Sequence, residues 1–202
     1  MYILYYHPYS QHARRIVALF EEAGLDYDLR TVAVDKGEHL SPEYLAINPN
    51  HQVPTFIDAD VTIHESNAVL RYLCAKHGLT DWYPEDLKDR AMVEQWLDWN
   101  QCRLVPSVAD IVVNTLFRGD QGDRAAIARG KEKLEELAAI LDAGLEGRQF
   151  LTGAKPTIAD LSVASNITQL GLADAAPSQP NITNWYRRVS GIDGFRKSLP
   201  PG

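Results

Sequence analysis

The chain carries the stretch Asn50-His51-Gln52-Val53-Pro54, followed a short way further on by Glu65-Ser66, and these two segments decide the fold. Val53-Pro54 predicts the entry to a short strand at residues 55–58, since proline favours strand starts. Glu65-Ser66 predicts the start of a helix just after a second short strand, at residues 61–63. A backbone edge set by a proline, beside a helix N-terminus that carries a hydroxyl group, suits a small peptide-like anion.

The sequence around these segments alternates strand-like and helical patterns over residues 1–77. Apolar residues from Ala13 to Ala23 recur at helical spacing on one face, and Gly24 closes that helix. The other expected elements are strands at Tyr2–Tyr6, Tyr27–Val34, Thr55–Asp58 and Val61–Ile63, a helical turn at Ser41–Leu45, and a helix that Glu65-Ser66 opens and that continues to Gly78. The order βαβαββα predicts a mixed four-stranded sheet with helices on its faces, in which the first two strands are parallel.

The second half of the chain has helical periodicity throughout. A linker at residues 78–85 separates the first domain, residues 1–77, from an all-helical domain at residues 86–202. The expected helices are Leu87–Leu116 with an interruption at Pro106, Arg124–Leu145, Ile158–Leu172 and Ile182–Val189. The segment Thr157-Ile158-Ala159-Asp160 has the pattern of a capping box, and the apolar run after it predicts a buried central helix.

Composition excludes several function classes. The chain has 202 residues, is 45% hydrophobic and 23% charged, and carries a net charge of −7 without a basic block, which argues against a nucleic-acid partner. No apolar run approaches the length of a membrane span, and the N-terminus lacks the pattern of a secretory signal. The two cysteines, Cys74 and Cys102, form no disulfide framework and no zinc spacing. These features predict a cytoplasmic protein without a metal.

Ser10 lies just past the first strand, where the first helix opens. One interpretation is a simple N-cap, because serine is well suited to satisfy the free amides at a helix start. The other is chemical: a helix N-terminus attracts anions, and a hydroxyl donor placed there can hold a thiolate. A free thiol has a pKa of about 8.5, so that only a few per cent of it is nucleophilic at neutral pH.

The other candidate positions also have two interpretations. Val53-Pro54 is either a plain strand entry or a cis peptide that turns the main chain of Val53 toward an extended ligand. Ser66 either caps its helix or grips a carboxylate at the helix start, while Glu65 orients the site or meets an ammonium group. His39 and His51 are either ordinary loop histidines or, with Gln52, lie where a second carboxylate of an extended tripeptide binds.

The chain as a whole resembles the cytosolic glutathione S-transferases. The motifs that carry the resemblance are Ser10-Gln11-His12-Ala13-Arg14, Gly37-Glu38-His39-Leu40-Ser41, Asn48-Pro49 through Val53-Pro54, Glu65-Ser66 and Thr157-Ile158-Ala159-Asp160. The first of them is similar to the serine-type classes, theta and delta, and to their bacterial relatives. The resemblance implies a thioredoxin-like domain, a linker and an all-helical domain, glutathione as co-substrate, a role in detoxification and a cytoplasmic homodimer.

The resemblance also implies roles for single residues. Ser10 is expected to hydrogen-bond the glutathione sulfur, and Val53, fixed by Pro54, to pair with the cysteinyl backbone. Glu65 and Ser66 are expected at the γ-glutamyl end. The glycine carboxylate is expected near His39, His51 and Gln52. The electrophile is expected between Tyr9 and the long helix that begins at Leu87, with Arg103 and Phe117 as further pocket residues.

The sequence departs from the family pattern at three points. His12-Ala13 stands where serine-type members usually have Pro-Cys, so that His12 either tunes the thiol or faces solvent. The family often supplies an acid from the neighbouring subunit to the glutamyl amine, and Gln101 is a poor match for it. Serine at the active position argues against mixed-disulfide chemistry, because a serine forms no disulfide with glutathione.

Three kinds of function fit this pattern. The first is conjugation of glutathione to small hydrophobic electrophiles. The second uses the same thiolate for dehalogenation, isomerisation or peroxide reduction. The third is a non-catalytic module of the same fold that mediates protein interactions, against which the joint presence of Ser10 and Glu65-Ser66 counts.

Overall fold

A computed structural model describes residues 1–200. They divide into two compact units, one formed by residues 1–80 together with 192–200 and the other by residues 81–191. Each unit has its own hydrophobic core.

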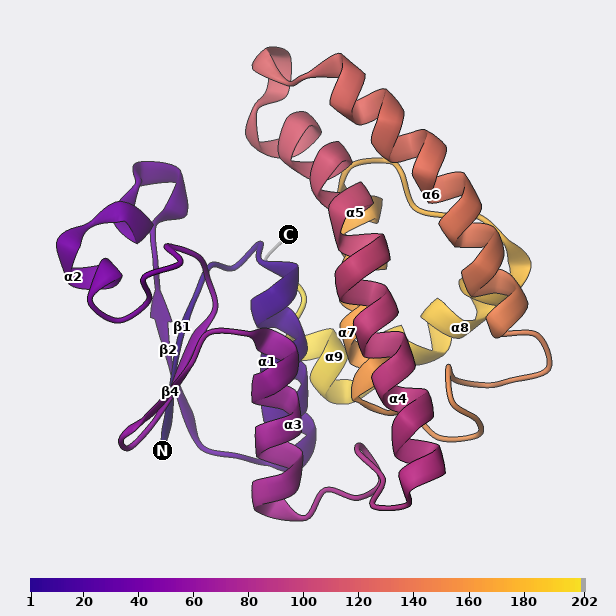
Figure 1. The fold of residues 1–202 in the computed structure, drawn as a ribbon, viewed down its shortest axis with the longest axis horizontal. Coiled ribbons are helices and arrows are strands. Elements are labelled where there is room, and N and C mark those ends of the chain that lie inside the picture. Colours follow the sequence, from indigo (N-terminus) through magenta and orange to yellow (C-terminus); the bar gives the residue numbers. More distant parts are fainter. Residues whose placement is uncertain (201–202) are drawn as a thin grey trace. The chain divides into compact units, whose positions relative to one another are not determined.

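The first unit contains a small mixed sheet with the strand order β2-β1-β3-β4. Its elements are β1 (Tyr2–Tyr6), α1 (Gln11–Ala23), β2 (Tyr27–Thr31), 3₁₀ turns at Val34–Lys36 and Glu38–Leu40, α2 (Pro42–Leu45), β3 (Thr55–Asp58), β4 (Val61–Ile63), α3 (Ser66–His77) and α9 (Asp193–Lys197). Strand β1 runs parallel to β2 and antiparallel to β3, which pairs antiparallel with β4. The predicted βαβαββα order is therefore confirmed. Helices α1 and α3 lie on one side of this sheet and α2 on the other (Figure 1).

Helix α1 begins and ends where its sequence predicts. The side chain of Ser10 accepts a hydrogen bond from the amide of Ala13, and Gly24 ends the helix with φ of +61°, a conformation that favours glycine. Phe20 of its buried face stacks near Tyr2 and Phe56, so that an aromatic cluster fills the space between helix and sheet.

Strand β2 is shorter than the predicted Tyr27–Val34. It ends at Thr31 because its partner β1 ends at Tyr6, directly opposite. The chain then turns away into the first 3₁₀ turn, and the Glu38 carboxylate accepts the amide of Ala33 at 2.6 Å.

The sequence pattern gave no sign of α9, which belongs to the first unit and packs against α1. Phe195 is fully buried. The amide of Gly194 donates to Glu22 at 2.6 Å, and a Cβ atom at this glycine would lie 2.4 Å from the carbonyl oxygen of Ala18. This close approach requires a glycine.

The second unit is all helical, as predicted. Its elements are α4 (Leu87–Trp99), a π-helical turn (Asn100–Leu104), α5 (Val105–Val112), a second π-helical turn (Val113–Phe117), a 3₁₀ turn (Gly119–Gln121), α6 (Arg124–Gly144), α7 (Ile158–Leu172) and α8 (Pro180–Ser190). Helix α7 is buried from Ile158 to Leu170 and contacts α4, α5 and α8, so that it is the central helix that the apolar run predicts.

The expected interruption at Pro106 takes the form of the first π-helical turn. Proline has no amide hydrogen, so the carbonyl of Cys102 cannot receive the regular helical bond from residue 106. The amide of Val105 instead bonds to the carbonyl of Asn100, five residues back. The helix therefore widens by one residue just before the proline.

The capping box at the start of α7 is confirmed. The buried carboxylate of Asp160 accepts hydrogen bonds from the amide and the hydroxyl of Thr157, at 2.8 and 3.1 Å. It also accepts from the amide of Leu151 at 2.9 Å and from the indole of Trp185 at 2.8 Å. Asp160 thus ties the helix start to a loop and to α8.

The predicted domain limits of 1–77 and 86–202 stay a prediction, since compact units and domains need not coincide. The chain passes from the first unit to the second between Thr80 and Asp81, and it returns to the first unit at Ile192. No helix within residues 1–200 is both long and apolar enough to cross a membrane.

Candidate functional site

Four loop segments of the first unit meet at one edge of the sheet. Tyr6 at the end of β1 lies opposite Thr31 at the end of β2, and Tyr5 lies opposite Thr55 at the start of β3. Ile63 at the end of β4 pairs in turn with residue 56. The segments that leave or enter the sheet at this edge carry Ser10, His39, Val53 and Glu65-Ser66. The sheet register therefore gathers residues that are far apart in the sequence.

Ser10 is half-buried at the N-cap of α1. Its Oγ accepts from the amide of Ala13 at 3.2 Å, and its own amide donates to the carbonyl of His7 at 2.9 Å. The N-cap interpretation is therefore confirmed. It does not compete with the chemical one, because a hydroxyl that accepts one hydrogen bond still has its hydrogen to donate.

The loop before β3 is held by two buried polar side chains. The carbonyl of Gln52 accepts from the Tyr44 hydroxyl at 2.6 Å and from the Asn48 amide at 2.8 Å. Both side chains also bond the hydroxyl of Thr55. Asn48 and Tyr44 were not among the predicted site residues, and Asn48 entered the sequence analysis only within the motif Asn48-Pro49 through Val53-Pro54.

The Val53-Pro54 peptide bond is cis, as the functional interpretation of this pair expects. Within residues 1–200, no group donates to or accepts from the main chain of Val53, whereas the carbonyl of Gln52 before it is bonded and Thr55 after it pairs within the sheet. Its amide and carbonyl are therefore available to a ligand with an extended backbone.

Glu65 and Ser66 stand at the first turn of α3. Glu65 is exposed and occupies the N-cap position without bonding the helix amides, while Ser66 is buried. The N-cap side chain of α3 thus leaves the first amides of the helix uncapped, just after the end of β4. An anionic group binds favourably at such a position, and the carboxylate of Glu65 suits an ammonium group next to it.

Positive charge is buried beside this turn. Arg15 of α1 donates from Nη1 to the Asn67 side chain at 3.1 Å. Burial and the charge of Arg14 lower the pKa of Arg15 to about 9, while the charge of Glu65 opposes this shift. Arg15 is therefore still a cation at neutral pH.

His12, unlike Arg15, is uncharged at neutral pH. Burial, and then the charge of Arg15, lower the pKa of His12 to about 3. The imidazole is therefore neutral across the physiological range. Its Nε2 atom lies 3.5 Å from Nε2 of Gln11, the residue before it in the chain. The side chain is half-buried, and both predicted roles of His12, tuning the thiol and facing solvent, stay predictions.

The remaining predicted glutathione contacts are loop residues. His51 is exposed and has a positive φ of 47°, and Gln52 is exposed beside it. His39 is half-buried in the second 3₁₀ turn, and its Nδ1 has no hydrogen-bond partner within residues 1–200. All three leave donor groups available for a carboxylate.

The predicted electrophile residues belong to different units. Tyr9 is an exposed residue of the first unit, next to Ser10. Arg103 and Phe117 are exposed residues of the second unit. Each of these two lies in one of the π-helical turns, which are frequent at functional sites.

The cysteines do not supply an alternative nucleophile at this edge. Cys74 is buried, and burial raises the pKa of its thiol to about 12. Cys102 is exposed on the second unit. Among residues 1–200, no group of three or more His, Cys, Asp or Glu side chains is placed to hold a metal ion.

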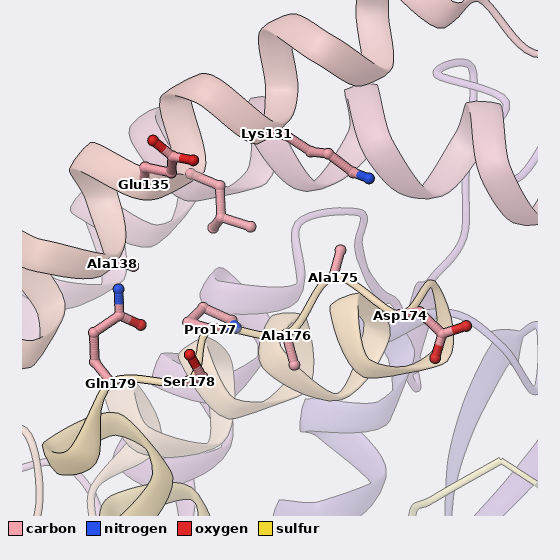
Figure 2. A pocket seen from close by; sticks show the side chains of 10 residues that line it. Lys131, Glu135, Ala138, Asp174, Ala175, Ala176, Pro177, Ser178 and Gln179 are labelled. Atoms are coloured by element: carbon pink, nitrogen blue, oxygen red, sulfur yellow. The ribbon is translucent and has the colours of Figure 1, made fainter.

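The helical unit contains a cavity of about 310 Å³ that none of the predicted site residues lines. Figure 2 shows Lys131 and Glu135 of α6 on one side of it and the segment Asp174–Gln179 on the other. The candidate site therefore rests on the sheet edge of the first unit and not on this cavity.

Comparison with known sequences identifies the family of this chain. Residues 1–75 match the sequence model of the glutathione S-transferase N-terminal domain, and residues 124–188 match that of the C-terminal domain. The chain belongs to the glutathione S-transferase superfamily. This transferase is 32% identical over 190 residues to a probable glutathione S-transferase, GSTF2, of Oryza sativa subsp. japonica, with 91% of this chain and 88% of that protein covered. It is 31% identical over 185 residues to glutathione S-transferase 2 of Anopheles gambiae, with 90% and 87% covered.

Solved structures agree with this assignment. Poplar glutathione transferase F1 has 30% identity and a TM-score of 0.89, with 98% of this chain and 95% of that chain covered. A delta-class glutathione transferase of Nilaparvata lugens has 31% identity and a TM-score of 0.89, with 98% and 93% covered. The predicted thioredoxin-like domain, helical domain and glutathione S-transferase activity are confirmed, with glutathione as co-substrate. The assignment to the serine-type theta and delta classes stays a prediction.

Proposed function

We propose that this glutathione transferase activates glutathione as a thiolate at Ser10 and transfers it to small hydrophobic electrophiles. The observation that carries the proposal is the position of the Ser10 hydroxyl. It caps α1 at the sheet edge where the unbonded main chain of Val53 and the start of α3 also lie.

The binding step follows from these positions. Glutathione is an extended tripeptide, and its cysteinyl backbone pairs with the amide and carbonyl of Val53. Its γ-glutamyl end meets the first amides of α3 with Ser66, and its ammonium group meets Glu65. Its glycine carboxylate lies near His39, His51 and Gln52.

The chemical step needs a thiolate at neutral pH. Lowering the pKa of a thiol by about two requires about 2.7 kcal/mol of preferential stabilisation of the anion. A hydrogen bond from the Ser10 hydroxyl to the sulfur, together with the dipole of α1, is of this size. The thiol proton leaves to solvent, and the sulfur electron pair forms the new bond to carbon. In a substitution the leaving group departs with its own electron pair.

Tyr9, Arg103 and Phe117 are the proposed contacts of the electrophile. They are exposed, and they combine aromatic surface with one cation. We also propose a cytoplasmic homodimer, which membership of the family supports and which sedimentation equilibrium tests by mass.

The test of the activating residue is the variant Ser10→Ala. We expect kcat to fall by about 10²-fold or more while the dissociation constant of glutathione changes by less than about threefold, because the hydroxyl acts on the sulfur and not on the carboxylates. The measurements are steady-state kinetics with 1-chloro-2,4-dinitrobenzene and calorimetric titration with glutathione. An unchanged kcat would contradict the proposal.

A further inference from the structure

A buried hydrogen bond joins the helix that carries Ser10 to the turn that carries Glu65 and Ser66. Arg15 of α1 is fully buried, and its Nη1 lies 3.1 Å from Oδ1 of Asn67. Asn67 is itself buried and directly follows Ser66 in the first turn of α3. A shift of α3 against α1 would therefore break this bond inside the unit.

A buried guanidinium is costly and is rarely found without a specific task. Removing a charge from water costs several kcal/mol unless hydrogen bonds and opposite charge compensate. Asn67 supplies one such bond, and the exposed carboxylate of Glu65 supplies opposite charge. Both compensating groups lie in the segment that we assign to the γ-glutamyl end of glutathione.

The ligand gives a reason for a cation at this place. Glutathione as a thiolate has two carboxylates, one ammonium group and the charged sulfur, so that its net charge is negative. The proposed contacts include no permanent cation; they are Ser10, His39, His51, Gln52, Val53, Glu65 and Ser66. Glu65 is an anion close to where the γ-glutamyl carboxylate binds, and its field needs a balancing positive charge.

We propose that Arg15 is a positioning residue for glutathione, which through Asn67 holds the first turn of α3 so that Glu65 and Ser66 meet the γ-glutamyl end. The inference rests on the proposed function, since it takes the binding mode of glutathione from it. Arg15 acts through Asn67 and does not touch the ligand.

Two fragments of glutathione separate this role from a general structural one. γ-Glutamylcysteine keeps the γ-glutamyl end, whereas cysteinylglycine lacks it. For Arg15→Met and for Asn67→Ala we expect the dissociation constant of γ-glutamylcysteine to rise about tenfold, the size of one lost hydrogen bond to a charged group. The dissociation constant of cysteinylglycine, measured by competition, should change less than about twofold.

The matched control is Arg14→Met. It removes the same charge from the neighbouring position of α1, so it should leave the ratio of the two dissociation constants unchanged. A melting curve shows whether Arg15→Met folds. If it does not fold, the two dissociation constants measured for Asn67→Ala test the proposal by themselves. Equal changes for both fragments in the Arg15 and Asn67 variants, or no change for either, would overturn the proposal.

Failure of the inference and failure of the proposed function give different results. If the native chain lowers the thiol pKa of bound glutathione and Ser10→Ala abolishes this, the proposed function stands whatever Arg15 does. If the native chain does not lower it, the proposed function fails, and the two fragments still report on Arg15.

Discussion

His12 is the residue for which the sequence left two roles open, and its charge state restricts the first of them, tuning the thiol. With its pKa lowered to about 3 by burial and by Arg15, the imidazole stays neutral and is far too weak a base to take a proton from a thiol. Ser10 therefore has no titrating partner in His12. In the proposed function its hydroxyl therefore acts by hydrogen bonding and not as part of a proton relay.

The lowered pKa of His12 predicts a loss of stability in acid. An unfolded histidine takes up a proton near pH 6.5, whereas the folded one does so near pH 3, so the unfolded state binds more protons between these values. The free energy of unfolding should fall from pH 7 to pH 5, by about 1 to 2 kcal/mol through this group. In His12→Gln this part of the decrease should be absent in urea unfolding at the two pH values. Identical decreases in both proteins would contradict it.

Single residues of the site could be predicted when their backbone position is set by local sequence. Ser10, Val53-Pro54 and Glu65-Ser66 each stand at a strand or helix boundary, and the structure has those boundaries within one or two residues. Asn48, Tyr44 and Arg15 were missed, because their contacts depend on side chains that approach from other segments.

At the scale of elements, the capping box of α7 should control the stability of the helical unit. Replacing Asp160 by alanine leaves four buried donors without their acceptor. We expect Asp160→Ala to lower the free energy of unfolding by about 3 kcal/mol or more. Chemical denaturation measures it.

The matched control is Asp110→Ala on the surface of the same unit. Asp110 forms an ion pair with Arg129, whose side chain is largely exposed. Loss of such a pair costs about 1 kcal/mol or less. If both alanine variants lose the same free energy, the role assigned to Asp160 is wrong.

The contact between α9 and α1 predicts a second sensitive position. A Cβ atom at Gly194 would lie 2.4 Å from the carbonyl oxygen of Ala18 and 2.9 Å from the amide of Glu22. Gly194→Ala should therefore displace α9 and lower the free energy of unfolding by about 1 to 3 kcal/mol.

The control for this variant is Gly171→Ala in α7. A Cβ atom there has nothing within 4 Å, and alanine is the better helix former by about 1 kcal/mol. Thermal unfolding should show a lower melting temperature for Gly194→Ala and an equal or higher one for Gly171→Ala. A melting temperature of Gly194→Ala equal to that of the native chain would contradict the packing role of α9.

Elements with clear periodicity were predictable, and those set by tertiary contact were not. The long helices and the short hairpin follow from apolar spacing and turn residues. The end of β2 depends on the end of its partner strand, and α9 is a five-residue helix whose burial depends on α1. The local sequence contains no pattern that indicates where β2 ends or that α9 forms.

At the scale of the whole molecule, the proposed glutathione contacts lie in one part of the chain, whereas two of the three proposed electrophile contacts lie in another. The proposed glutathione contacts lie within residues 1–75, which match the N-terminal family model. Arg103 and Phe117 lie between the two matched ranges, in the stretch with both π-helical turns. The reaction therefore follows from the family, whereas the proposed contacts Arg103 and Phe117 lie outside the two matched ranges.

The proposed activation of glutathione by Ser10 is tested most directly by the ultraviolet absorbance of the bound thiolate as a function of pH. The measurement is made on the native chain and on Ser10→Ala. If Ser10 activates the thiol, the bound thiol titrates about two pH units below its free value of about 8.5 in the native chain and returns toward that value in the variant. A bound thiol that titrates at its free value in the native chain, or equally low in both proteins, would contradict the role of Ser10 as the activating residue.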